Sequence, residues 1–183
     1  VSKPFYLFPV LFVIIAIVLF AHYCYKAYRQ RIRKNVDEPM QLSLLSVAML
    51  ALPLLLLLVL FVFLLLNNGH QQLVLAYGFA IFFGWLTAII LGMTFKTLPF
   101  IAWNKVYHQK AGLQKTPNPK DLFNNAVFKA MSLAYISGFL LFATGILTSV
   151  ILLLQGGAAL LLLTALLYNW NVFKIIFHQP KTP

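Results

Sequence analysis

The stretch that decides the fold runs from residue 70 to residue 107 and reads HQQLVLAYGFAIFFGWLTAIILGMTFKTLPFIAWNKVY. It begins with a histidine, continues as a long apolar run that contains small residues, and ends in an aromatic and basic segment. Five of its small residues recur at a strict spacing of four: Ala76, Ala80, Gly84, Ala88 and Gly92. On a helix this spacing forms a continuous small-residue ridge, along which neighbouring transmembrane helices can approach closely. We therefore expect this stretch to be the central helix of a membrane bundle.

The composition of the chain excludes a soluble domain. Its 183 residues are 62% hydrophobic and only 9% charged, and several apolar runs are long enough to cross a hydrocarbon core of about 30 Å. These runs lack the alternation of a transmembrane strand, so helices must satisfy the backbone hydrogen bonds in lipid. The predicted fold class is all-α, an integral membrane helical bundle. Its five predicted transmembrane helices cover about residues 4–25, 43–66, 70–95, 131–154 and 158–177.

The sequence also predicts how the spans begin, bend and end. Pro53 should kink the second span, because proline removes a backbone donor and clashes with the preceding turn. A Lys-Thr-Leu-Pro hinge after residue 95 should end the third span, and the aromatic segment beyond it should lie along the membrane interface. Small residues on the fourth span, including Gly138 and Gly145, form a second packing face, which predicts that this span is a neighbour of the third. A Gln155-Gly156-Gly157 turn should join the last two spans.

The net charge of +11 does not indicate nucleic-acid binding. The basic residues lie in two loops and a tail beside the membrane spans, where the positive-inside rule accounts for them. Besides the lipid bilayer itself, anionic lipid head groups are the expected partners of these basic loops.

The distribution of Lys and Arg predicts the topology. Counted along the chain, the six segments that flank the spans carry 1, 5, 0, 6, 0 and 2 basic residues, so alternate segments total one and thirteen. This asymmetry places the amino end outside and the basic loops and carboxyl end in the cytoplasm. Because no signal sequence precedes the first span, we expect an odd number of spans upstream. The chain would then be a single transmembrane domain at the carboxyl-terminal part of a longer polytopic protein.

The candidates for chemistry reduce to one histidine. No Asp or Glu lies inside a predicted span, which argues against a proton relay or a cation-coupled site. Phosphate-binding, nucleophile and zinc motifs are absent from the sequence, and the lone Cys24 permits no internal disulfide. His70 remains, at the outer start of the small-residue helix. It could ligate a membrane heme through a neutral imidazole, or it could cap the helix or face water.

A family resemblance favours heme at His70. The combination of His70, a helix rich in small residues and the segment GMTFKTLPFIAWNKVY resembles bacterial membrane proteins related to the catalytic subunit of heme-copper oxidases. The resemblance covers mainly residues 69–107. It implies that His70 is an axial ligand to heme iron and that Lys96 and Trp103 anchor the cytoplasmic end of the helix. It also implies a bacterial cytoplasmic (inner) membrane and further membrane subunits as partners.

One departure from the family changes the expected function. The corresponding helix of the family carries a His-x-His pair, with one imidazole for each of two hemes, whereas this chain reads His70-Gln71-Gln72. The resemblance therefore implies a degenerate subunit, either with a single heme for electron transfer or without heme, and it leaves open whether the chain is an enzyme. Two alternatives stay open, namely a non-catalytic structural or accessory subunit of a larger complex and, third, a transporter fragment.

Overall fold

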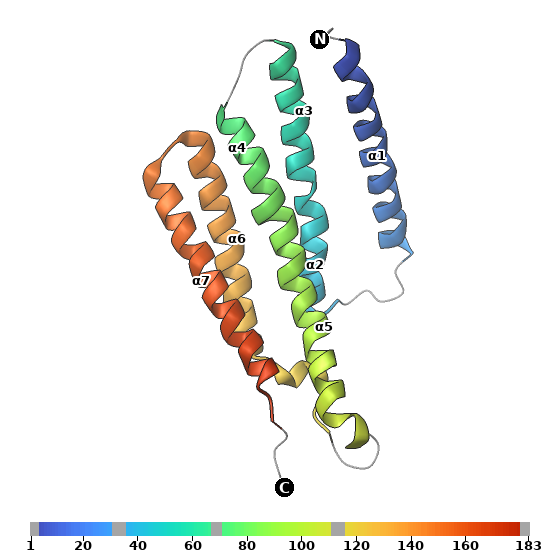
Figure 1. Cartoon of the computed structure of the whole chain (residues 1–183), viewed down its shortest axis with the longest axis vertical. Coiled ribbons are helices and arrows are strands. Elements are labelled where there is room, and N and C mark those ends of the chain that lie inside the picture. The colour runs from blue at the N-terminus through green and yellow to red at the C-terminus, as the bar shows by residue number, and fades with distance from the viewer. Residues whose placement is uncertain (1–3, 31–35, 67–70, 111–115, 180–183) are drawn as a thin grey trace. The chain divides into compact units, whose positions relative to one another are not determined.

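The computed structural model is all-α and describes residues 4–30, 36–66, 71–110 and 116–179 (Figure 1). No strand occurs among these residues. Within them, five helices are long and apolar enough to cross a membrane: Leu11–Arg29, Glu38–Leu65, Gln71–Tyr107, Asn125–Thr148 and Ile151–Ile176. The predicted fold class is thus confirmed, and the architecture fits an integral membrane protein.

The chain divides into two compact units, residues 1–36 and 37–183. The first unit contains α1 (Pro4–Arg29), a single long apolar helix. Near its end, the Arg29 guanidinium lies 5.9 Å from the centre of the Tyr25 ring, within the range of a cation–π contact. All later helices belong to the second unit.

The second span begins earlier than predicted and is divided by a break. It consists of α2 (Glu38–Met49) and α3 (Ala51–Leu65), which are separated at Leu50. The break falls three residues before Pro53, and the next backbone bond, from the Leu54 N–H to the Leu50 carbonyl, is long at 3.4 Å. Because proline has no N–H to donate four residues back, the helical bonding weakens here, at the place where the sequence predicts a kink.

The central span is one continuous helix in three parts. These are α4 (Gln71–Phe79), the π-helix η1 (Ala80–Leu86) and α5 (Thr87–Tyr107). The hinge predicted after residue 95 is wrong, because α5 continues through Pro99 to Tyr107. The aromatic segment therefore forms the last turns of α5.

Tertiary contacts explain why the helix continues past the proline. Pro99 itself is buried, and α5 packs against η3 (Pro119–Leu122) in the segment that follows it. Further along, the Trp103 Nε1–H donates to the Pro117 carbonyl at 2.6 Å, which fixes the end of α5 to the following segment. Transmembrane helices tolerate proline where such contacts stabilise the surrounding turns, and the local sequence alone does not reveal these contacts.

The last two spans form a hairpin whose turn differs from the prediction. α6 (Asn125–Thr148) ends at Ser149, which adopts the left-handed conformation with φ 58°, and α7 (Ile151–Ile176) begins two residues later. The turn predicted at Gln155–Gly157 is wrong, because these residues lie inside α7. A methyl group on Gly157 would lie only 2.6 Å from the Phe142 backbone nitrogen, so this glycine serves close helix packing instead of a turn.

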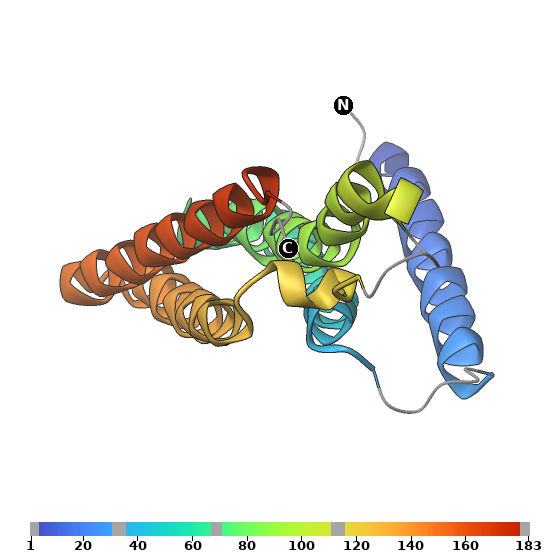
Figure 2. The ribbon, with the colours of Figure 1, turned by 90° about the horizontal axis from the view of Figure 1, so that it is seen from below.

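The central helix contacts helices on both of its sides. α2 and α3 pack against it on one side, and α6 and α7 pack against it on the other. Seen from below, α6 and α7 lie together to one side of the central helix (Figure 2). Two short 3-10 helices, η2 (His108–Lys110) and η3 (Pro119–Leu122), belong to the connection to α6. The main buried cluster draws on the central helix and its neighbours: Leu42, Ala88, Leu91, Phe95, Phe123, Phe128, Met131, Tyr135 and Ile175.

Candidate functional site on the central helix

The small-residue ridge is buried along its whole length. Its five members are Ala76, Ala80, Gly84, Ala88 and Gly92. A methyl group on Gly92 would lie 2.6 Å from the Ser43 backbone nitrogen and 2.8 Å from the Pro39 carbonyl oxygen, so α5 and α2 touch backbone to backbone. A methyl group on Gly84 would lie 3.1 Å from the Phe139 ring on α6. The ridge therefore faces helices on both sides of the central span.

The π-helix explains how five residues at a spacing of four stay buried. In an α-helix each such step advances about 40° beyond a full turn, so four steps would carry the last residue about 160° around the helix. The wider π turns of η1 reduce this drift, because they hold more residues per turn. η1 was not predicted, although the unusually long run of fours is the signal that could have indicated a wide turn.

Tyr135 on α6 supplies the polar contact to the π-helix. Its side chain is 0% exposed, and its single O–H is shared between the carbonyl oxygens of Phe83 and Gly84, each 2.7 Å from the hydroxyl oxygen. The same oxygen lies 3.6 Å from the Met49 sulfur on α2. Tyr135 therefore joins three helices at one atom. Sequence reasoning missed it, because a tyrosine in an apolar run carries no sign of its partner.

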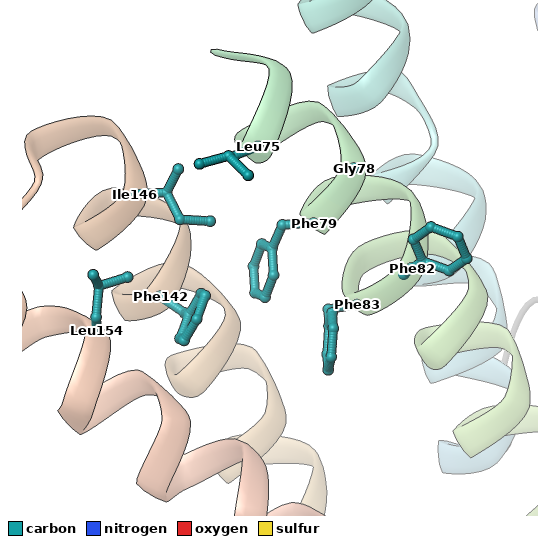
Figure 3. A pocket seen from close by; sticks show the side chains of 8 residues that line it. All are labelled: Leu75, Gly78, Phe79, Phe82, Phe83, Phe142, Ile146 and Leu154. Carbon is teal, nitrogen blue, oxygen red and sulfur yellow. The ribbon is translucent and has the colours of Figure 1, made fainter. Parts of the chain in front are cut away.

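An open apolar groove lies beside the π-helix (Figure 3). It has a volume of about 420 Å³ and runs between the central helix and the α6–α7 hairpin. Its lining is apolar throughout: Leu75, Gly78, Phe79, Phe82, Phe83, Phe142, Ile146 and Leu154. The Phe79 ring stacks on the rings of Phe83 and Phe142, with ring centres 5.0 and 4.7 Å apart. The volume is in the range of ligand sites in proteins.

A hydrogen bond ties the beginning of α4 to the α6–α7 turn. The Gln72 Nε2 donates to the Ser149 hydroxyl at 2.6 Å. This bond lies at the same end of the helices as the groove, since Leu75 follows Gln72 by one turn and Ile146 precedes Ser149 by one turn. The groove thus begins within one turn of two uncharged polar side chains.

The predicted heme ligand His70 lies outside the described residues. It directly precedes α4, the helix whose later residues line the groove. In the described part of the chain, no group of three or more His, Cys, Asp or Glu side chains could hold a metal ion. Of the other histidines, His178 is engaged with the Tyr107 hydroxyl, at 2.9 Å from its Nε2.

The other predicted packing glycines lie between α6 and α7. A methyl group on Gly138 would lie 2.9 Å from the Leu160 Cβ, and one on Gly145 would lie 2.9 Å from the Leu154 backbone nitrogen. These glycines therefore face the α7 helix and not the central span. Predicting the fourth span as a neighbour of the third was incomplete, because its small face serves the hairpin.

The polar end of the unit is held by hydrogen bonds and ion pairs. The Asn171 side chain, which is 0% exposed, accepts from the Asn124 N–H at 2.8 Å and donates to the Asn124 carbonyl at 3.0 Å. Asn124 in turn caps the first turn of α6 through its side-chain oxygen. These contacts join the end of α7 to the start of α6.

Two lysines at this end form ion pairs with acidic residues around the start of α2. Lys120 pairs with Asp37 at 2.6 Å, and Lys129 pairs with Glu38 at 3.0 Å. The predicted anchor Lys96 directs its ammonium group at the Met40 sulfur, 3.1 Å away. Part of the positive charge at this end therefore acts within the unit. The side chains of both ion pairs are at least about a third exposed, so each pair adds little to stability.

Comparison with known proteins adds no family to this geometry. No protein-family model, no curated protein and no solved structure matches the chain.

Proposed function

We propose that this chain is a heme-binding membrane subunit for electron transfer, related to the catalytic subunit of heme-copper oxidases. The observation that carries the proposal is the phenylalanine-lined groove of about 420 Å³ on the helix that His70 precedes. Ligand sites are typically apolar cavities with a few polar groups at their edge. The groove is open and its lining is apolar, and the hydrogen-bonded pair Gln72 and Ser149 lies within about one turn of one end.

The residues present suit one heme better than two. His70 would be the axial ligand through a neutral imidazole, and the rings of Phe79, Phe83 and Phe142 would keep water away from an apolar macrocycle. Bound heme would supply one-electron transfer at its iron. Gln71 and Gln72 occupy the positions that follow His70, so the chain lacks the His-x-His pair of the family. A single heme is therefore proposed, and full oxygen reduction is not.

The proposed topology places His70 at the outer face of a bacterial inner membrane. The described lysines of the second unit lie in the last part of α5, in the connection to α6, near the start of α6 and near the end of α7: Lys96, Lys105, Lys110, Lys120, Lys129 and Lys174. The positive-inside rule favours the cytoplasm for this end. Lysines there that are not engaged with Asp37 or Glu38 would attract anionic lipid head groups.

A structural subunit of a larger membrane complex is the second candidate. The specific observation in its favour is that packing alone accounts for the ridge, because Gly84 and Gly92 touch α6 and α2 directly. In this alternative no cofactor is needed, and other membrane subunits cover exposed apolar faces such as the one containing Phe82 and Leu75.

Visible absorption of the purified protein separates the two candidates. We expect a Soret band that shifts on reduction with dithionite, and we expect His70→Ala to lose it. His108→Ala, which changes an exposed histidine at the other end of the same helix, is the matched control and should keep the band. A protein purified from heme-supplied cells without a Soret band would contradict the proposal, and so would a band that survives His70→Ala.

A further inference from the structure

The π-helix η1 changes the hydrogen bonding in the middle of the central span. In an α-helix the Thr87 N–H would donate to the Phe83 carbonyl, four residues back. Here it is directed at the carbonyls of Phe82, five residues back, and Gly84. The Thr87 hydroxyl also donates to the Phe82 carbonyl, at 2.8 Å. The wide turn thus takes from Phe83 the donor that an α-helix would give it.

The Tyr135 hydroxyl gives this part of the wide turn a donor from another helix. It lies 2.7 Å from the Phe83 oxygen and 2.7 Å from the Gly84 oxygen. No water is available in the hydrocarbon core to satisfy a carbonyl, so a partner from another helix stabilises the wide turn. The Tyr135 side chain is fully buried, which keeps this partner at the turn.

The wide turn sets the rotation of the outer part of the helix. A π turn adds about one residue to the helix, and one residue corresponds to about 100° of rotation and 1.5 Å of rise. The side chains of Gln72 and Phe79 meet α6 and its turn in this rotational setting, through the bond to Ser149 and the stack on Phe142. In a regular helix, the same side chains would point about 100° away.

We infer that Tyr135 is a positioning residue: through the carbonyls of Phe83 and Gly84 it holds the π turn that docks the outer end of the central helix on the α6–α7 hairpin. This end, α4, follows His70 in the sequence and contributes Leu75, Gly78 and Phe79 to the groove. The inference does not depend on heme, because it concerns only the rotation of α4 relative to α5.

Cross-linking across the Gln72–Ser149 contact measures this rotation. The full chain is prepared with Cys24→Ser, Gln72→Cys and Ser149→Cys, and it is treated with a short bifunctional methanethiosulfonate, since glutamine reaches farther than a disulfide allows. Linked peptides are quantified by mass spectrometry. We expect efficient linking in this background and a rate about tenfold lower after Tyr135→Phe, as a buried hydrogen bond of ordinary strength implies. Tyr168→Phe removes a hydroxyl that lies 3.2 Å from Thr94, and it should leave the rate unchanged.

The second part of the cross-linking experiment deletes one residue from the π-helix, and its result is decisive. Removing Phe82, an exposed side chain of η1, should convert the π turn to an α turn and keep both halves of the helix in register. The deletion variant should therefore link at about the rate of the parent background. A variant that combines the deletion with Tyr135→Phe should link faster than Tyr135→Phe alone. Linking at the full rate in Tyr135→Phe would overturn the inference. Loss of linking in the deletion variant would also overturn it, even if Tyr135→Phe does not fold.

The result of the cross-linking experiment is independent of the absorption measurement that tests the proposed function. Absence of a Soret band leaves the cross-linking result unaffected. An unchanged cross-linking rate, in turn, leaves the role of His70 to the absorption measurement.

Discussion

At the scale of single residues, buried polar side chains in this protein act between helices. Tyr135 joins α6 to the π turn, and Asn171 joins α7 to the start of α6. Tyr135 meets carbonyls inside the apolar bundle, and the Asn171 side chain is itself fully buried, so loss of either contact leaves a polar group unpaired at a cost. Neither residue stands out in the sequence, because its partner is more than 45 positions away.

Asn171 offers a clear test of this role. Asn171→Ala leaves both the N–H and the carbonyl of Asn124 without their partner, so we expect the free energy of unfolding to fall by about 2 kcal/mol. Asn169→Ala is the matched control, because the Asn169 side chain is exposed and bonds only within its own helix, to the Ala165 carbonyl. Thermal or denaturant unfolding in detergent measures both. Equal decreases in the free energy of unfolding for the two variants would contradict the proposed role of Asn171 between α6 and α7.

At the scale of helices, sequence patterns predict the spans better than their ends. Hydrophobic length identifies five spanning helices, because length and composition alone decide whether a segment can cross a membrane. The end of the central helix and the position of the last turn were missed. Pro99 and Gly157 act through packing against other parts of the chain, and local propensity does not contain those contacts.

The adjacent glycines of α7 test the corrected turn. Gly157→Ala should lower the free energy of unfolding by about 2 kcal/mol, because the added methyl group meets the Phe142 backbone. Gly156→Ala should be neutral or stabilising by up to about 1 kcal/mol, since nothing lies within 4 Å of its new Cβ and alanine favours the helix. If Gly156 and Gly157 formed a turn, both substitutions would destabilise the protein.

The candidate site was predicted only in part, for a physical reason. Small residues repeated at every fourth position indicate a packing surface, and all five residues of this ridge are buried. The groove depends on the rotation that the π turn imposes and on aromatic rings from α6. Those contributions come from the tertiary structure, so Phe79 and Phe142 carried no functional signal in the sequence.

At the scale of the whole molecule, the proposed topology puts Ser149 outside and Gln109 in the cytoplasm. A membrane-impermeant maleimide tests this in right-side-out vesicles, with Cys24→Ser as the background. We expect Ser149→Cys to be labelled directly and Gln109→Cys to be labelled only after permeabilisation, because the basic segments should remain in the cytoplasm. The reverse labelling pattern would contradict the proposed orientation and would place His70 on the cytoplasmic side.

The packing of the central helix against its neighbours underlies the fold of the second unit, the groove and the proposed site. Two glycines of this helix give the most direct test, because they differ only in their surroundings. A methyl group on Gly92 would meet backbone atoms of Ser43 and Pro39, whereas one on Gly78 would meet nothing within 4 Å. In denaturant unfolding, Gly92→Ala should lose about 2 kcal/mol, and Gly78→Ala should stay within about 1 kcal/mol of the parent protein. Equal unfolding free energies for the two variants would contradict the central position of this helix.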